Sequence, residues 1–185
     1  MTLEAYAKAR PGMRAEVMAQ KKLRRVFLGD NVMLMFENEL LIRYQVQEML
    51  RVEKIFEEDG IAHELESYVP LTPDGANFKA TMQIEYADET ERRRMLGLLK
   101  GIEDRVWIQV AGCDKVFAIA DEDLVRENEQ KTSAVHFLRF ELDPAMVAKA
   151  KAGAALGVGV DHSEYCAAIP DLAFDVRMSL VADLN

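Results

Sequence analysis

The stretch FKATMQIEY, residues 78–86, alternates strictly between apolar and polar side chains. Phe78, Met82 and Ile84 fall on one side of the alternation, and Lys79 and Gln83 fall on the other. Successive side chains of a β-strand point to opposite faces, so this pattern predicts a strand with one buried face. A shift of one residue in its register would exchange the two faces, so the alternation also predicts which side chains are buried.

Hairpins and single helices surround this strand in the sequence. Gly29-Asp30 separates two β-rich runs within residues 24–37, which predicts a hairpin, and residues 105–120 predict two strands about a turn near Gly112. Strands in hairpins mixed with single helices predict an α+β fold with a mixed, mostly antiparallel sheet covered by helices. The other expected elements are an N-terminal helix broken at residues 10–12, a second helix to residue 22, helices at 63–68, 88–99, 122–129, 144–153 and 170–184, and strands at 133–142 and 156–162.

The length and composition are those of one folded domain. A chain of 185 residues buries most of its apolar surface without disulfides, and no linker rich in Pro, Gly or Ser divides it, so we expect a single domain over residues 1–185. The 32 acidic and 23 basic residues give a net charge of -9, which opposes binding to nucleic acid. We also expect a cytoplasmic protein without a membrane partner, because no apolar run approaches roughly 18 residues and the N-terminus lacks the core of a signal peptide.

Cysteine usage argues against several kinds of site. Only Cys113 and Cys166 are present, far apart and without a CxxC pair. This count suggests neither a disulfide framework nor a structural zinc site nor an iron–sulfur ligand set, so no cofactor is expected. No Cys-His or Ser-His-Asp arrangement can be proposed for nucleophilic catalysis either.

A long amphipathic helix is expected at about residues 38–59, ended by Asp59-Gly60 in the manner of a glycine C-cap. Three polar residues, Asn38, Gln45 and Glu53, share its apolar arc. A carboxylate in an apolar setting is costly unless it is paired, so Glu53 is expected to form a buried ion pair. The candidate partners are Arg24, Arg25 and Arg139, and the alternative role for Glu53 is that of a general base or a ligand.

A second stripe lies on the same helix. Arg43, Gln47 and Arg51 follow one another at four-residue steps, with Glu48 three residues before Arg51. A row of guanidinium and amide donors can hold a carboxylate or a phosphate. The alternative is a solvated helix face whose ion pairs contribute a few tenths of a kcal/mol each.

Two histidines lie on the apolar faces of predicted strands. His136 belongs to the strand at 133–142 and His162 to the strand at 156–162. If these strands pair antiparallel, both rings lie at one end of the sheet and can bind a metal with Cys166 or a Glu. If the intervening helix makes a crossover, the rings lie at opposite ends. The crossover is the more natural connection, so we expect no metal site.

Six stretches spread over most of the chain are KKLRRVFLG, FEN, QVQEMLRVE, ATMQIEY, AVHFLRFEL and VDHSEY. Together they resemble a bacterial family known as domain of unknown function 3501. The resemblance implies no established activity. It implies at most a cytoplasmic accessory protein, because genes of such proteins are often found beside those of rubrerythrin-like proteins and of cysteine-rich iron–sulfur proteins related to heterodisulfide reductase subunits. The matching stretches direct attention to Glu37, Asn38, Gln47, Glu48, Arg51, Glu53, His162 and Tyr165.

Two functional hypotheses follow. The first is an accessory or interaction protein without catalytic activity. Its protein partner would belong to a rubrerythrin or iron–sulfur redox system, and the protein itself could form a homo-oligomer. The second is a small anion-binding protein or enzyme. Its candidate residues for binding an anion or a partner are Arg43, Gln47, Glu48, Arg51, Glu53, His162 and Tyr165.

Overall fold

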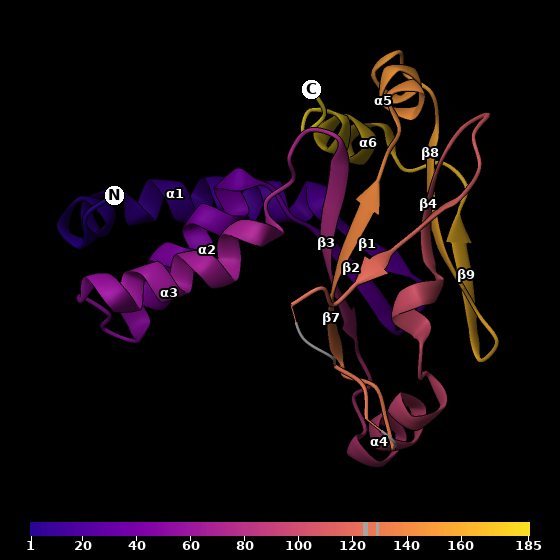
Figure 1. Ribbon diagram of the computed structural model, residues 1–185, viewed down its shortest axis with the longest axis horizontal. Coiled ribbons are helices and arrows are strands. Elements are labelled where there is room, and N and C mark those ends of the chain that lie inside the picture. The colour runs from indigo at the N-terminus through magenta and orange to yellow at the C-terminus, as the bar shows by residue number, and fades with distance from the viewer. Residues whose placement is uncertain (124–125, 129) are drawn as a thin grey trace.

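The computed structural model describes residues 1–123, 126–128 and 130–185, which form two antiparallel sheets and an arm of helices (Figure 1). The five-stranded sheet has the order β1-β2-β3-β7-β6 and the four-stranded sheet has the order β5-β4-β8-β9. The first sheet consists of β1 (Arg25–Leu28), β2 (Val32–Phe36), β3 (Asn77–Ile84), β7 (Val135–Glu141) and β6 (Ile119–Ala120). The second consists of β5 (Val116–Phe117), β4 (Val106–Val110), β8 (Leu156–His162) and β9 (Tyr165–Ile169).

The alternating stretch forms β3, as its pattern predicts. Phe78, Met82 and Ile84 are buried, whereas Lys79 and Gln83 lie on the opposite face. The hairpin about Gly29-Asp30 is also confirmed, because β1 and β2 pair antiparallel on either side of this turn. The expected α+β class with antiparallel strands is therefore correct.

The strands form two sheets rather than one, and both contribute to one hydrophobic core. Residues 156–160 of β8 are all buried, so neither face of this strand is exposed. Gly159 makes close packing possible at this strand, because a Cβ atom here would lie 2.4 Å from the ring of Trp107 on β4. The strand β9 did not emerge from the sequence, since its apolar side chains do not alternate clearly.

The first helix, α1 (Leu3–Arg24), is continuous, so the break expected at residues 10–12 is wrong. Pro11 lies inside α1 and removes one backbone donor. Contacts on both sides of the proline hold the helix together, because Tyr6 and Val17 are both buried against α2 (Glu39–Val52) and its neighbours.

The long helix expected at 38–59 is shorter, since α2 ends at Val52, and the helix expected at 63–68 begins earlier, as α3 (Glu58–Tyr68). Lys54 adopts a left-handed backbone with φ 55°, and the amide of Ile55 donates to the carbonyl of Leu50 at 3.0 Å. These features are those of a Schellman C-cap, in which a non-glycine residue takes the position usually held by glycine. Gly60 therefore lies inside α3 instead of ending α2.

The remaining helices lie at the periphery of the sheets (Figure 1). They are α4 (Glu89–Leu98), α5 (Pro144–Lys151), α6 (Phe174–Val181) and two short 3-10 turns, η1 (Val69–Leu71) and η2 (Ile102–Arg105). The helix expected at 122–129 includes residues 124, 125 and 129, which lie outside the described residues. Among those that are described, no helix is both long and apolar enough to cross a membrane.

The arm consists of α1, α2 and α3, and it projects from the five-stranded sheet with the N-terminus at its far end (Figure 1). A second hydrophobic cluster joins it to the outer face of β2, because Met33 and Met35 belong to the same cluster as Leu41 and Tyr44 of α2. The arm covers this outer face only in part, and the uncovered part forms the floor of a groove.

Candidate functional site

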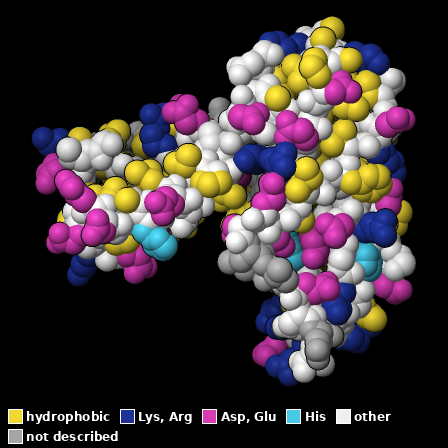
Figure 2. Space-filling view, viewed as in Figure 1, with side chains coloured by type: hydrophobic (Ala, Val, Ile, Leu, Met, Phe, Trp, Pro, Cys, Tyr) yellow, Lys and Arg dark blue, Asp and Glu magenta, His cyan; other side chains and the backbone are white. Residues whose placement is uncertain are grey.

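The groove between the arm and the five-stranded sheet contains two cavities, of about 590 and 310 Å³. Leu71 and Phe137 line both cavities, so the two lie next to one another. The space-filling view shows the hollow where the arm meets the sheets (Figure 2).

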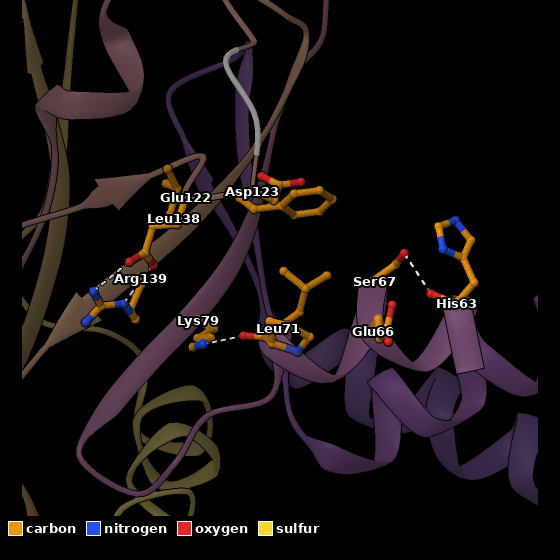
Figure 3. Close-up of a pocket in the computed structure, with 11 residues that line it drawn as sticks. His63, Glu66, Ser67, Leu71, Lys79, Glu122, Asp123, Leu138 and Arg139 are labelled. Atoms are coloured by element: carbon orange, nitrogen blue, oxygen red, sulfur yellow. Dashed lines mark hydrogen bonds and ion pairs between the residues drawn. The ribbon is translucent and has the colours of Figure 1, made fainter. Parts of the chain in front are cut away.

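The larger cavity lies between α3 and the strands β3 and β7 (Figure 3). Its two cations are already engaged: Lys79 donates to the carbonyl of Pro70, and Arg139 pairs with Glu122 at 2.8 Å and also with Glu141. The guanidinium of Arg139 lowers the pKa of Glu122, which keeps this pair ionised. The rest of the wall combines apolar side chains, such as Leu71 and Leu138, with polar ones that include Glu66 and Asp123. Its acidic side chains disfavour an anion, so this cavity suits the uncharged part of a ligand.

The smaller cavity has a different chemistry. Lys21 and Arg25 line one side, and Gln45, Tyr68 and Gln83 also face it. Among the residues that the structure describes, the side chains of these five make no hydrogen bond and no ion pair. Met33 and Met35 supply apolar contact area in the same cavity. The cavity therefore combines two cations and three polar side chains that remain available to a bound molecule.

Glu37 adds a titratable group to the smaller cavity. Its carboxyl accepts a hydrogen bond of 2.7 Å from Thr81. Burial raises the pKa of Glu37, although the hydrogen bond from Thr81 and the positive charges of Lys21 and Arg24 oppose this shift. A carboxyl with a raised pKa inside a cleft is a candidate functional group.

The stripe predicted on α2 lies elsewhere. Arg43 is exposed and pairs with Glu39 at 3.7 Å. Gln47 is buried, and its amide nitrogen donates to the carbonyl of Met1 at 3.2 Å. Neither of these residues, nor Arg51, lines the two cavities of the groove.

Glu48 is the centre of the contacts between α1 and α2. Its carboxylate accepts hydrogen bonds from Arg10 at 2.7 and 2.9 Å and from the hydroxyl of Tyr6 at 2.6 Å. Arg51 donates to the same carboxylate at 3.1 Å. Two of the predicted binding residues, Glu48 and Arg51, therefore hold the arm together in this structure.

The buried ion pair expected for Glu53 is wrong. Glu53 is exposed and forms the C-cap of α2, because the helix ends at Val52, seven residues before the expected end at residue 59. The buried arginine is Arg24, which pairs with Asp183 and donates to the carbonyl of Phe36 at 2.9 Å.

The two other polar residues of the α2 arc, Asn38 and Gln45, have different roles. The side chain of Asn38 caps α2 by accepting a hydrogen bond of 2.9 Å from the amide of Leu41. Gln45 faces the smaller cavity of the groove. Of the three polar residues on the arc, Asn38 thus begins the helix, Gln45 faces the groove and Glu53 ends the helix.

His162 and Tyr165 stabilise turns and connections near β8 and β9. The Nε2 atom of His162 donates to the carbonyl of Lys100 at 3.0 Å, and its Nδ1 atom accepts from the amide of Glu164 at 3.2 Å. The hydroxyl of Tyr165 donates to the carbonyl of Leu28 at 2.6 Å and accepts from the amide of Asn31 at 3.0 Å. Tyr165 therefore connects the second sheet to the first hairpin.

His136 and His162 do not meet, because their strands belong to different sheets. The structure instead brings His136 together with Glu103 and Asp121, whose potential ligand atoms lie within 4.8 Å of one another. The sequence indicated no metal site, and neither of these acids was among the candidate residues. No periodic pattern marks them, since they come from the turn η2 and from the residue after β6.

Comparisons with known proteins place the chain among proteins without a known function. A family model described as "Protein of unknown function (DUF3501)" matches residues 1–184. No curated protein gives a significant match. A crystal structure at 1.90 Å of a "novel protein of unknown function" from Burkholderia pseudomallei K96243 is similar, with 56% identity and a TM-score of 0.92. The alignment covers 100% of this chain and 96% of that one.

Proposed function

The chain belongs to the DUF3501 family of proteins of unknown function, and from its geometry we propose that it is a small-molecule-binding protein. The ligand has one anionic group and an apolar body, and it lies in the groove between the arm and the five-stranded sheet. The observation that carries this proposal is the pair of cations, Lys21 and Arg25, that face the smaller cavity without an ion pair among the described residues.

The shape and lining of the groove support this class of ligand. Small-molecule sites typically measure about 300–1,000 Å³ and combine apolar walls with a few polar groups that orient the ligand. The two cavities measure about 310 and 590 Å³ and share Leu71 and Phe137. The anionic group binds beside Lys21 and Arg25, because the cations of the larger cavity are engaged by Glu122, Glu141 and a backbone carbonyl.

Binding of the ligand is coupled to protonation of Glu37. An anion near this carboxyl disfavours its ionised form and so raises its pKa further. The complex therefore takes up a proton at Glu37, and the affinity for an anion increases as the pH falls. The anion-binding hypothesis drawn from the sequence is thus kept with other residues. The anion lies beside Lys21 of α1 and Arg25 of β1 rather than beside Arg43, Gln47 and Arg51.

Calorimetric titration with octanesulfonate tests the proposal, because this probe has an apolar chain and stays charged at every accessible pH. We expect binding that methanesulfonate and octanol, which each lack one half of the probe, do not reproduce. Lys21→Gln and Arg25→Gln should each weaken binding at least tenfold. Lys22→Gln is the matched control, since Lys22 is exposed and does not line the cavity. Unchanged affinity in both groove variants, or no binding at millimolar probe, contradicts the proposal.

A second candidate function is that of an accessory interaction protein that docks through the arm. Apolar and acidic side chains share the visible face of the arm (Figure 2). Phe56, between α2 and α3, is 66% exposed, and Val52, Leu65 and Val69 are also exposed. Exposed apolar groups in one region of a surface are typical of protein interaction sites.

The family resemblance suggests a rubrerythrin-like or iron–sulfur protein as the partner of the arm. Sedimentation of the chain with such a purified protein tests this candidate, and sedimentation of the chain alone identifies self-association. Phe56→Ser should abolish the complex if the arm is the docking surface. A complex that survives this substitution argues for another surface.

A further inference from the structure

The inner face of β7 carries a polar cluster that is independent of the groove. Phe137 faces the groove, whereas the neighbouring residue His136 points to the other side of the sheet and is 0% exposed. The Nδ1 atom of His136 lies 2.6 Å from a carboxylate oxygen of Asp121. Its Nε2 atom lies 3.0 Å from the hydroxyl of Thr132 and 3.0 Å from the carbonyl of Ser133.

A second acid lies beside the ring of His136. The carboxylate of Asp121 accepts from Nδ1, and the lone pair of Nε2 is then directed toward the hydroxyl of Thr132. The carboxylate of Glu103 lies 3.9 Å from the same Nε2 atom. Burial raises the pKa of Glu103, which reflects the cost of its charge at this position.

The spacing of the atoms around Nε2 suits a metal ion. The hydroxyl of Thr132 lies 3.4 Å from the carboxylate of Glu103, so Nε2, this hydroxyl, this carboxylate and the carbonyl of Ser133 are separated by 3.0 to 3.9 Å along the known edges. An ion with bonds of about 2.1 Å has its ligand atoms about 3.0 Å apart in an octahedron and about 3.4 Å apart in a tetrahedron.

We propose that His136 and Glu103 bind a divalent first-row transition metal ion, with the carbonyl of Ser133 and the hydroxyl of Thr132 within reach as neutral oxygen ligands. Asp121 accepts the Nδ1 proton and orients the ring, an arrangement common to metal-binding histidines. One imidazole, one carboxylate and neutral oxygens suit Zn²⁺, Mn²⁺ or Fe²⁺, whereas Cu⁺ prefers sulfur ligands.

The metal site and the groove differ in their expected response to pH. An ion binds a neutral imidazole and an ionised carboxylate, so metal binding tightens as the pH rises. Binding of an anion in the groove tightens as the pH falls. The two proposals therefore succeed or fail separately.

The experiment uses untagged protein freed of metal with a chelator and titrated with Zn²⁺, Mn²⁺ or Fe²⁺ under exclusion of oxygen. Native mass spectrometry should find one ion per chain, and the ion should raise the midpoint of thermal unfolding. Glu103→Gln and Asp121→Asn should each lower the affinity at least tenfold. Asp104→Asn is the matched control, because Asp104 is the exposed neighbour of Glu103, and it should change the affinity less than twofold.

The outcome does not depend on a variant that fails to fold. Circular dichroism of the metal-free Glu103→Gln protein checks its fold, and the amide occupies the same volume as the carboxyl. Absence of stoichiometric binding by all three ions overturns the proposal. Binding that Glu103→Gln leaves unchanged in a folded protein overturns it equally.

Discussion

The hydroxyl of Thr81 donates a hydrogen bond of 2.7 Å to the carboxyl of Glu37, and so connects β3 to the segment that precedes α2. Burial raises the pKa of this carboxyl above that of the unfolded chain, about 4.3. The contribution of Glu37 to stability is therefore fully present below pH ~4.3 and is lost as the pH rises through the folded pKa.

Glu37→Gln should consequently stabilise the ligand-free protein at neutral pH, because the amide can still accept the hydrogen bond and carries no charge to bury. Each unit by which the pKa of Glu37 is raised corresponds to about 1.4 kcal/mol. Urea unfolding at pH 7 and at pH 4 measures the effect. The gain should disappear at the lower pH, and a loss of stability at pH 7 would show that the charge of Glu37 is required by the fold.

Glu48→Gln should have the opposite effect and lower the free energy of unfolding at neutral pH. Arg10 first, and then Arg51 and Tyr6, hold the pKa of Glu48 well below its usual range, although partial burial opposes them. A depressed pKa contributes stability that is present above pH ~4.3 and is lost as the pH falls. We expect a cost of about 2 kcal/mol at neutral pH, since hydrogen bonds to charged groups contribute ~1.5–3 kcal/mol each.

The control for Glu48 is Glu39→Gln. The side chain of Glu39 is 77% exposed and lies 3.7 Å from Arg43, so its loss should cost less than ~0.5 kcal/mol. Chemical unfolding of both variants decides the point. Equal effects would mean that Glu48 does not join α1 to α2 in solution.

Arg24→Ala should be among the most destabilising single changes. Arg24 is buried, pairs with Asp183 and donates to the carbonyls of Phe36 and Ser179. Removing one partner of a buried pair typically costs ~3–5 kcal/mol. Glu53→Ala is the comparison, and it should stay within ~0.5 kcal/mol because Glu53 is exposed. If Glu53→Ala lowered the thermal midpoint strongly, Glu53 would form the buried ion pair that the sequence predicted.

Gly29→Ala should destabilise the first hairpin by about 1–2 kcal/mol. Gly29 has φ +65°, and a Cβ atom here would lie 2.6 Å from the hydroxyl oxygen of Tyr165. Tyr165→Phe should relieve part of this crowding, so the double variant should lose less stability than the sum of the two single variants. Strict additivity in thermal unfolding would show that the hydroxyl of Tyr165 moves away without cost.

The strongest local patterns predicted the fold well. The alternation of Phe78, Met82 and Ile84 identified the buried face of β3, and Gly29-Asp30 identified the hairpin of β1 and β2, because each pattern reports on neighbouring residues alone. The end of α2 was misplaced because Lys54 takes a left-handed conformation that sequence statistics assign to glycine. Tertiary packing also kept α1 continuous through Pro11.

The candidate sites could not be predicted from local sequence patterns, because their residues come from separate elements. Lys21, Gln45 and Gln83 come from a helix, a second helix and a strand, and only the packing of the arm brings them to one cavity. Glu103 and Asp121 likewise meet His136 only in the folded chain. The regular spacing of Arg43, Gln47 and Arg51 attracted attention on one helix, but a shared helix face does not show what lies opposite it.

The most direct test of the groove as a ligand site is methyl NMR of protein labelled with ¹³C at the methionine methyl groups, titrated with octanesulfonate. Met33 and Met35 line the smaller cavity, whereas Met82 lies in the core and Met178 is exposed on α6. We expect saturable shifts of the Met33 and Met35 resonances that Lys21→Gln weakens, with Met82 and Met178 unchanged. Resonances of Met33 and Met35 that stay in place while the probe saturates, or shifts spread equally over all four methyl groups, would contradict the account.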